Sequence, residues 1–298
     1  MGLLIQNIEK SYGDKKVLSN LSLNSEKGEI IGLLGLNGAG KTTLMKILTG
    51  INLKWKGFIS YDGIDLRKKL IDIQKITGYL PENNPLYSEL FVSEYLLFIA
   101  RLYKIKKPNL EKVISITGLN KYENHKIENL SKGYKQRVGL AASIIHDPEL
   151  LILDEPTTGL DPNQIIEIRE LIKKLGEDKI VIFSTHILQE VEALCTRVVL
   201  LHKGEIILDS PIGNLKNPDK QIIKVTFDYR VETEALAKLS FVENVKNTFD
   251  FEYEISFKTD IDQRGKVFDF AHDNDLKILN LQQKNETLEE MFKSLTSS

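Results

Sequence analysis

The sequence of 298 residues contains only one cysteine, Cys195. A single thiol excludes an internal disulfide and is typical of proteins in a reducing compartment. Cys195 ends an apolar stretch with helical periodicity, so we expect a buried small hydrophobic residue rather than a reactive thiol. Four of the five histidines, at positions 125, 146, 202 and 272, lack the spacing of metal ligands, which argues against a histidine metal site.

Long apolar runs are also lacking. The closest, 95–100, is far shorter than the roughly 20 residues of a membrane span and is flanked by Glu94 and Arg101. The N-terminus has no basic start like that of a signal peptide, and Gln6 breaks the myristoylation pattern. We therefore expect a cytoplasmic protein that reaches the inner face of the cell membrane only through a partner.

There is no excess of basic residues either. The formal net charge is −2, so the chain lacks the overall electrostatic signature of a nucleic-acid-binding protein. Hydrophobic residues make up 42% and charged residues 28%, which is ordinary for a globular protein. The length predicts about two domains.

One glycine-rich segment, GLNGAGKTT at 35–43, stands out. An apolar run at 29–34 precedes it and predicts a buried strand, and 44–48 predicts the start of a helix. Glycines at 35, 38 and 40 allow positive φ, so that several backbone N–H groups can converge on an anion at a helix N-terminus. Lys41 can reach the β- and γ-phosphates, and the Thr42 hydroxyl can ligate Mg²⁺.

A second apolar run, 150–153, leads into Asp154 and Glu155. Ligands of open α/β sheets bind at the carboxyl ends of the strands, where this strand places both carboxylates. Asp154 is suited to hold Mg²⁺. Glu155, one residue further along, is suited to accept a proton from an attacking water molecule.

The remaining pattern predicts an α/β core with an inserted helical segment at about 83–148. A helix is expected over 64–75. A linker rich in Pro, Gly and Asn covers 211–219. Beyond it, the pattern restarts as βαββαβ with a trailing helix at 287–295, an order that suits a ferredoxin-like domain.

The glycine-rich segment at 35–43 has the pattern of a phosphate-binding P-loop. The segment LSKGYKQR at 130–137 indicates to which class of P-loop protein the chain belongs. Ser131 is a suitable N-cap, and Gly133 permits close backbone approach at the helix start. The segment resembles the signature sequence of ATP-binding cassette (ABC) ATPases. Lys132 and Tyr134 depart from the common glycine and glutamine.

The other cassette motifs follow in the same order, and the resemblance covers about residues 2–215. It implies that Glu155, His186 and Lys41 are catalytic. Glu82 stands where most cassettes have the glutamine of the Q-loop, and Gly159–Asp161 resembles the D-loop. The implied Mg²⁺ ligands are Thr42, Glu82 and Asp154. The implied nucleotide-binding residues are Tyr12, which would stack on adenine, and Gly35, Asn37, Gly38, Ala39, Gly40, Lys41, Thr42, Thr43, Ser131 and Gly133.

The resemblance implies a P-loop NTPase (RecA-like) core with an antiparallel β subdomain and a helical insertion over residues 1–215. A small α+β accessory domain follows at 220–298. The implied cofactors are ATP and Mg²⁺. Two cassettes are expected to close head to tail around ATP as a homodimer, with Ser131 and Gly133 contacting the γ-phosphate of the partner's nucleotide.

The expected function is the ATPase subunit of an exporter-type ABC transporter with a separate integral membrane permease, similar to gliding-motility-associated cassettes. In the family, a groove near the Q-loop receives the permease, and aromatics such as Tyr87, Phe91, Tyr95 and Phe98 are candidates to line it. No nucleic-acid partner is expected. The alternatives are a soluble ABC ATPase acting on DNA or ribosomes, and a regulator that binds ATP without hydrolysis.

Overall fold

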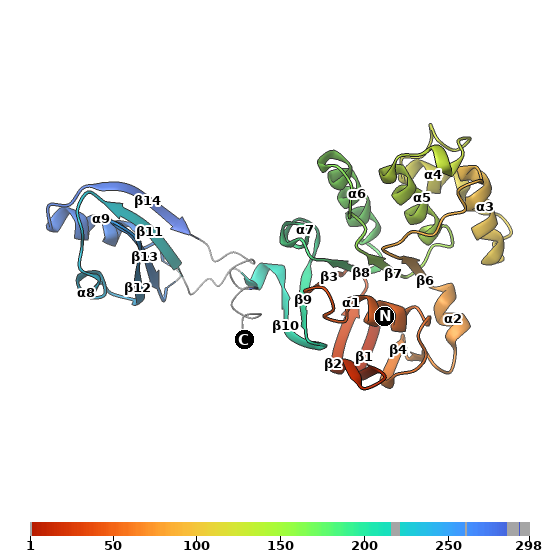
Figure 1. Cartoon of the computed structure of the whole chain (residues 1–298), viewed down its shortest axis with the longest axis horizontal. Coiled ribbons are helices and arrows are strands. Elements are labelled where there is room, and N and C mark those ends of the chain that lie inside the picture. Colours follow the sequence, from red (N-terminus) through yellow and green to blue (C-terminus); the bar gives the residue numbers. More distant parts are fainter. Residues whose placement is uncertain (1, 216–220, 260, 285–291, 293–298) are drawn as a thin grey trace. The chain divides into compact units, whose positions relative to one another are not determined.

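The computed structural model describes residues 2–215, 221–259, 261–284 and 292. The chain divides into two compact units, Met1–Ile212 and Gly213–Ser298 (Figure 1). In the described ranges, no helix has both the length and the apolar character needed to cross a membrane.

The first unit contains an antiparallel sheet of order β2-β1-β4-β5. Burial alternates along its two long strands, so one face is apolar and packs inward. Its strands are β1 (Gly2–Tyr12), β2 (Lys15–Glu26), β4 (Lys56–Tyr61) and β5 (Ile64–Asp65).

The expected helix over 64–75 is wrong in its first half. Ile64 and Asp65 form β5 and pair with Tyr61 and Ser60, and only α2 (Leu70–Lys75) is helical. Asp62 and Gly63 have φ of 47° and 78°, the combination that a two-residue Asp-Gly hairpin turn requires. The charged residues after this turn obscured the hairpin signal.

A six-stranded sheet of order β10-β9-β3-β8-β7-β6 forms the centre of the first unit. All its neighbours run parallel except the edge pair β10 and β9. β3 and β7 are buried along their whole length, which explains their unbroken apolar sequences. The strands are β3 (Ile30–Leu34), β6 (Thr77–Leu80), β7 (Leu150–Asp154), β8 (Ile180–Thr185), β9 (Arg197–His202) and β10 (Glu205–Pro211).

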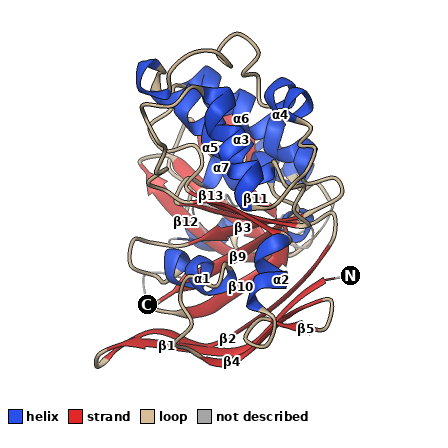
Figure 2. Ribbon diagram, turned by 90° about the vertical axis from the view of Figure 1, so that its right-hand side faces the viewer, coloured by secondary structure: helices blue, strands red, loops and turns tan. Residues whose placement is uncertain are grey.

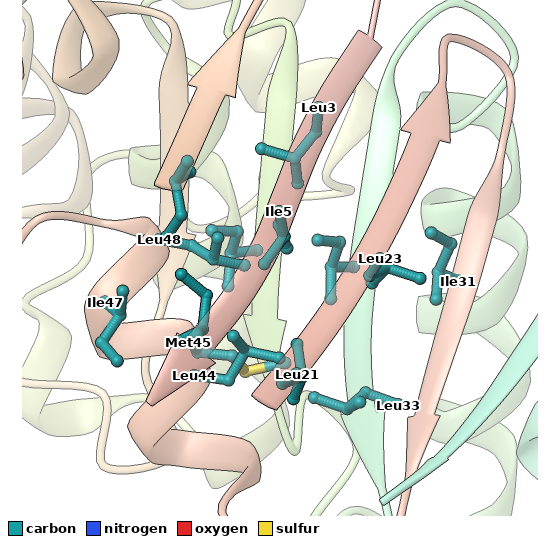
Figure 3. Packing of buried hydrophobic residues seen from close by; sticks show 14 of the residues in the cluster. Leu3, Ile5, Leu21, Leu23, Ile31, Leu33, Leu44, Met45, Ile47 and Leu48 are labelled. Atoms are coloured by element: carbon teal, nitrogen blue, oxygen red, sulfur yellow. The ribbon is translucent and has the colours of Figure 1, made fainter. Parts of the chain in front are cut away.

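Helix α1 (Lys41–Leu48) lies between the two sheets of the first unit (Figure 2). Leu44, Met45 and Leu48 of α1 belong to the same buried cluster as Leu3 and Ile5 of β1 (Figure 3). Both sheets therefore hold the helix that begins at the glycine-rich loop, and the loop has a rigid base.

The other helices of this unit include the expected insertion between β6 and β7. Helices α6 and α7 follow β7 and β8, respectively. The bounds are α3 (Val92–Leu102), α4 (Leu110–Ile116), α5 (Lys132–Ile144), α6 (Pro162–Leu175) and α7 (Leu188–Leu194).

The second unit has the expected βαββαβ order, and its antiparallel sheet has the order β12-β13-β11-β14. The first and third strands of the unit are central, as in a ferredoxin-like fold. The trailing helix expected at 287–295 lies outside the described residues, apart from Phe292. The elements are β11 (Gln221–Phe227), α8 (Thr233–Leu236), β12 (Val242–Phe249), β13 (Glu252–Phe257), α9 (Arg264–Asp273) and β14 (Ile278–Lys284).

Candidate active site at the carboxyl ends of the parallel strands

The glycine-rich loop joins β3 to α1, as the sequence predicts. Gly38 and Gly40 have φ of 81° and 113°, which glycine adopts without strain. Gly35 does not have the positive φ we expected. It is required for packing instead, because a Cβ there would clash with the carbonyl oxygen of Leu201.

Lys41, the first residue of α1, folds back over the loop. Its ammonium donates hydrogen bonds to the carbonyls of Gly35, at 2.6 Å, and Leu36, at 3.4 Å. Burial lowers the pKa of Lys41, while the carboxylates of Glu155, Asp154 and Glu82 act in the opposite direction. A buried ammonium within reach of the loop is suited to bind an anion that enters it.

Most of the residues proposed from the sequence line one cavity of about 520 Å³. The cavity brings the end of β1 together with the glycine-rich loop and the end of β7. Its lining includes Tyr12, Asn37, Gly38, Ala39, Gly40, Lys41, Thr42, Thr43, Glu82, Asp154 and Glu155. Gly35, Ser131, Gly133 and His186 are not among its lining residues.

Ser184 of β8 connects the two acidic residues. Its hydroxyl donates to Asp154 Oδ1 at 2.6 Å and accepts from the backbone N–H of Glu155 at 3.0 Å. β8 lies between β3 and β7, so it is the strand that can supply this bridge. Ser184 was not identified from the sequence, although its position next to Thr185-His186 at a strand end was a usable signal.

Asp154 has one oxygen, Oδ2, that is buried and has no hydrogen-bond partner among the described residues. A buried carboxylate oxygen needs a partner, and a cation is suitable. The described residues contain no cluster of three or more His, Cys, Asp or Glu that could hold a metal ion alone. Mg²⁺ is often held by one or two carboxylates together with substrate phosphates, so this donor set fits Mg²⁺ beside a nucleotide.

Glu155 and His186 form a pair at the edge of the cavity. His186 Nδ1 lies 3.0 Å from Glu155 Oε2 and 3.1 Å from Oε1, and the Thr158 hydroxyl donates to Oε2 at 3.2 Å. Glu155 is a non-glycine residue with φ of 51°, a costly backbone geometry of a kind that clusters at functional sites. The carboxylate is thus oriented by two neighbours and can accept a proton from water.

Ser131 is the N-cap of α5, as predicted, and accepts from the backbone N–H of Tyr134 at 3.5 Å. Gly133 is buried under the side chain of Gln164 from α6, where a Cβ would clash with the amide group. Lys132, one of the two departures from the signature pattern, lies directly over Gly159. Gln164 thus occupies the space that a side chain at position 133 would need, so only glycine fits there.

Tyr12 ends β1 and keeps half of its surface exposed. Asn52 donates to its hydroxyl at 2.8 Å, and Lys10 Nζ lies 4.5 Å from the ring centroid. Neither of these neighbours was identified from the sequence. They fix the orientation of the ring at the edge of the cavity.

Replacing Tyr12 with alanine is expected to weaken ATP binding about 10-fold, because aromatic stacking on a base contributes about 1–3 kcal/mol. Tyr12→Phe keeps the ring, loses only the Asn52 contact and serves as the matched variant. An equilibrium titration with ATP measures both. Equal affinities for wild type, Tyr12→Ala and Tyr12→Phe would show that the base does not stack here.

Comparison with known proteins points in the same direction as this geometry. Residues 18–158 match the family model described as ABC transporter. The chain is 38% identical over 216 residues to the lantibiotic transport ATP-binding protein SrtF of Streptococcus pyogenes, covering 72% of this chain and 93% of that protein. It is 33% identical over 296 residues to the bacitracin transport ATP-binding protein BcrA of Bacillus licheniformis, covering 97% of this chain and 95% of that protein.

Solved structures agree. One described as the ATP-binding subunit of an ABC transporter has a TM-score of 0.66 and 29% identity, and the match covers 72% of this chain and 92% of that one. The solved structure of CbiO1 from Clostridium perfringens, which is part of the ABC transporter complex CbiONQ, has a TM-score of 0.63 and 30% identity. The match covers 72% of this chain and 89% of that one. None of these similarities supports a role on DNA or ribosomes. The chain therefore belongs to the family of ATP-binding, ATP-hydrolysing subunits of ABC transporters.

Proposed function

We propose that two copies of this chain close head to tail around ATP and thereby drive a separate membrane permease. One observation carries this proposal: the cavity that holds Lys41, Asp154 and Glu155 contains neither Ser131 nor Gly133. The chain thus builds the loop and the acidic half of a site, and in this proposal a second chain supplies the signature half.

Within that site, the loop N–H groups and the Lys41 ammonium bind the phosphates of ATP. Glu155 orients a water molecule and accepts its proton as the water oxygen bonds to the γ-phosphorus and the bond to the β–γ bridging oxygen breaks. His186, held by Glu155, donates a hydrogen bond to the γ-phosphate. Thr42, Glu82 and Asp154 would hold Mg²⁺, which neutralises charge on the phosphate oxygens.

A second, larger cavity of about 690 Å³ adjoins the nucleotide site and supports a permease contact. It shares Thr42, Glu82 and Asp154 with the nucleotide cavity, so an occupant can sense the nucleotide. Of the four aromatics considered from the sequence, Tyr95 lines it, while Tyr87 makes edge contacts with Tyr95 and Phe98. We propose that this cavity receives a short helix of the membrane subunit at the inner face of the cell membrane.

Export stays our proposal for the direction, while SrtF and BcrA are named for lantibiotic and bacitracin transport. The relationship with BcrA spans nearly the whole chain and thus includes the second unit. The narrower similarity to gliding-motility cassettes stays a prediction, as does the description of residues 220–298 as an accessory domain.

Affinity purification from detergent-solubilised membranes tests the proposed partner. We expect a multi-span membrane protein to co-purify, and Leu102→Glu to abolish this, because Leu102 is 62% exposed and lines the second cavity. Ile71→Glu, equally exposed on α2 and away from the cavity lining, is the matched control and should retain the partner. Recovery only with ribosomes or nucleic acid would contradict a transporter.

A further inference from the structure

Glu190 on α7 is completely buried, although it is acidic. Its Oε2 accepts a hydrogen bond from the Thr185 hydroxyl at 2.7 Å. The same hydroxyl accepts from the backbone N–H of Ile187 at 3.1 Å. The two bonds bracket His186, because Thr185 and Ile187 are its neighbours in the chain. The turn that carries the histidine is thus fixed from one buried carboxylate.

Arg169 on α6 is the cation that faces Glu190. Its Nη2 lies 3.6 Å from Glu190 Oε1, and its side chain is 22% exposed. Glu190 Oε1 and Arg169 Nε both lack a hydrogen-bond partner among the described residues. A buried charge that is only partly compensated costs stability, and an apolar side chain at this place would pack at a lower cost. Packing alone therefore does not account for the carboxylate.

Helix α6 connects Gly133 with the turn that carries His186. The helix begins directly after the segment 159–161, with Asp161 as its N-cap, and its Gln164 covers Gly133. Five residues further along the same helix, Arg169 reaches Glu190. A single helix thus contacts the signature glycine at one end and, through Glu190, the turn that carries His186.

We propose that Glu190, held by Arg169, is a positioning residue for His186 and acts through the Thr185 hydroxyl. It touches no substrate atom. By keeping Thr185 and Ile187 fixed, it holds the imidazole in line with Glu155, at the 3.0 Å separation seen here. Loss of the anchor frees the turn and misaligns the pair.

Substitutions of Thr185 test the proposal with little change in volume. Thr185→Ser keeps the hydroxyl and is expected to retain kcat, whereas the near-isosteric Thr185→Val is expected to lower kcat about 10- to 100-fold, because misplacement by about 1 Å can cost that much. Glu190→Met removes the carboxylate acceptor at a similar side-chain length and is expected to behave like Thr185→Val. KM for ATP and the equilibrium affinity should stay within about twofold, since the phosphate-binding loop is untouched.

Two readouts separate positioning from a merely structural role. In protein with ¹³C-labelled histidine, the NMR signal of the His186 ring should shift in Thr185→Val and Glu190→Met and not in Thr185→Ser. Asp147→Asn is the matched control. It removes the carboxylate that pairs with Lys179, the residue just before the other end of β8, and should leave the His186 signal unchanged. Thermal unfolding confirms that each variant is folded.

The inference rests on the role of His186 in the proposed function, and His186→Ala distinguishes the two failures. If His186→Ala hydrolyses ATP like wild type, the proposed role of the histidine fails. If His186→Ala is inactive while folded Thr185→Val and Glu190→Met keep wild-type kcat and an unshifted His186 signal, the positioning role is overturned. A loss of stability without a change in kcat would likewise contradict positioning.

Discussion

Glu155→Gln is expected to lower the rate of ATP hydrolysis about 10²- to 10⁴-fold, the usual contribution of a positioned general base. The glutamine keeps the size of the side chain and can still hydrogen-bond to His186 and Thr158, which contact the carboxylate. It cannot take up the proton of the attacking water. ATP binding should persist because Lys41 and the glycine-rich loop are unchanged.

The proposed closure predicts that the same variant accumulates as an ATP-bound dimer, because in that proposal closure requires ATP and opening requires its hydrolysis. Light scattering with ATP and Mg²⁺ should report twice the monomer mass, and single-turnover kinetics should report the rate. Glu192→Gln is the matched control, because it changes an exposed carboxylate on α7, and it should hydrolyse ATP like wild type. A Glu155→Gln protein that stays monomeric under these conditions would contradict the closure model.

Lys41→Ala is expected to produce the largest loss of ATP affinity. A charge-assisted hydrogen bond contributes about 1.5–3 kcal/mol, which corresponds to an affinity about 10- to 150-fold lower per bond lost. The Lys41 ammonium already lies at the carbonyls of the glycine-rich loop, so the side chain needs little rearrangement before ATP binds. Removing a partly desolvated charge should leave the fold intact.

Calorimetric titration with ATP and with adenosine measures this effect. Adenosine lacks the phosphates, so its affinity should be the same for Lys41→Ala and wild type. Lys46→Ala, an exposed lysine on the same helix, is the control and should bind ATP normally. The phosphate-binding role of Lys41 would be refuted by an equal loss of affinity for both ligands, or by no loss for ATP.

The local parts of the site could be predicted from the sequence. Gly38 and Gly40, the apolar strands before 35 and 154, and the N-cap Ser131 each depend on a few neighbouring residues. Backbone φ limits, strand burial and capping act over that same short range. This is why all three appear where the sequence placed them. The hairpin at Asp62-Gly63 is equally local, but the charged residues that follow it also fit the helix expected over 64–75.

The contacts between distant segments could not be predicted in this way. Gly35 was expected to need positive φ, yet Leu201, far along the chain, is what excludes a side chain there. Ser184 joins Asp154 to Glu155 only because β8 lies beside β7. Gln164 covers Gly133 for a similar reason, since α6 meets the start of α5.

The sequence by itself determined the motifs, their order and the strand ends at which they stand, because short-range periodicity and glycine geometry encode them. Only the tertiary structure decided which side chains meet. It joins Glu155 to His186, and it places Glu190 between Thr185 and Arg169. Such contacts depend on strand order and helix packing, which the whole chain fixes through its shared core, so no single stretch of sequence contains them.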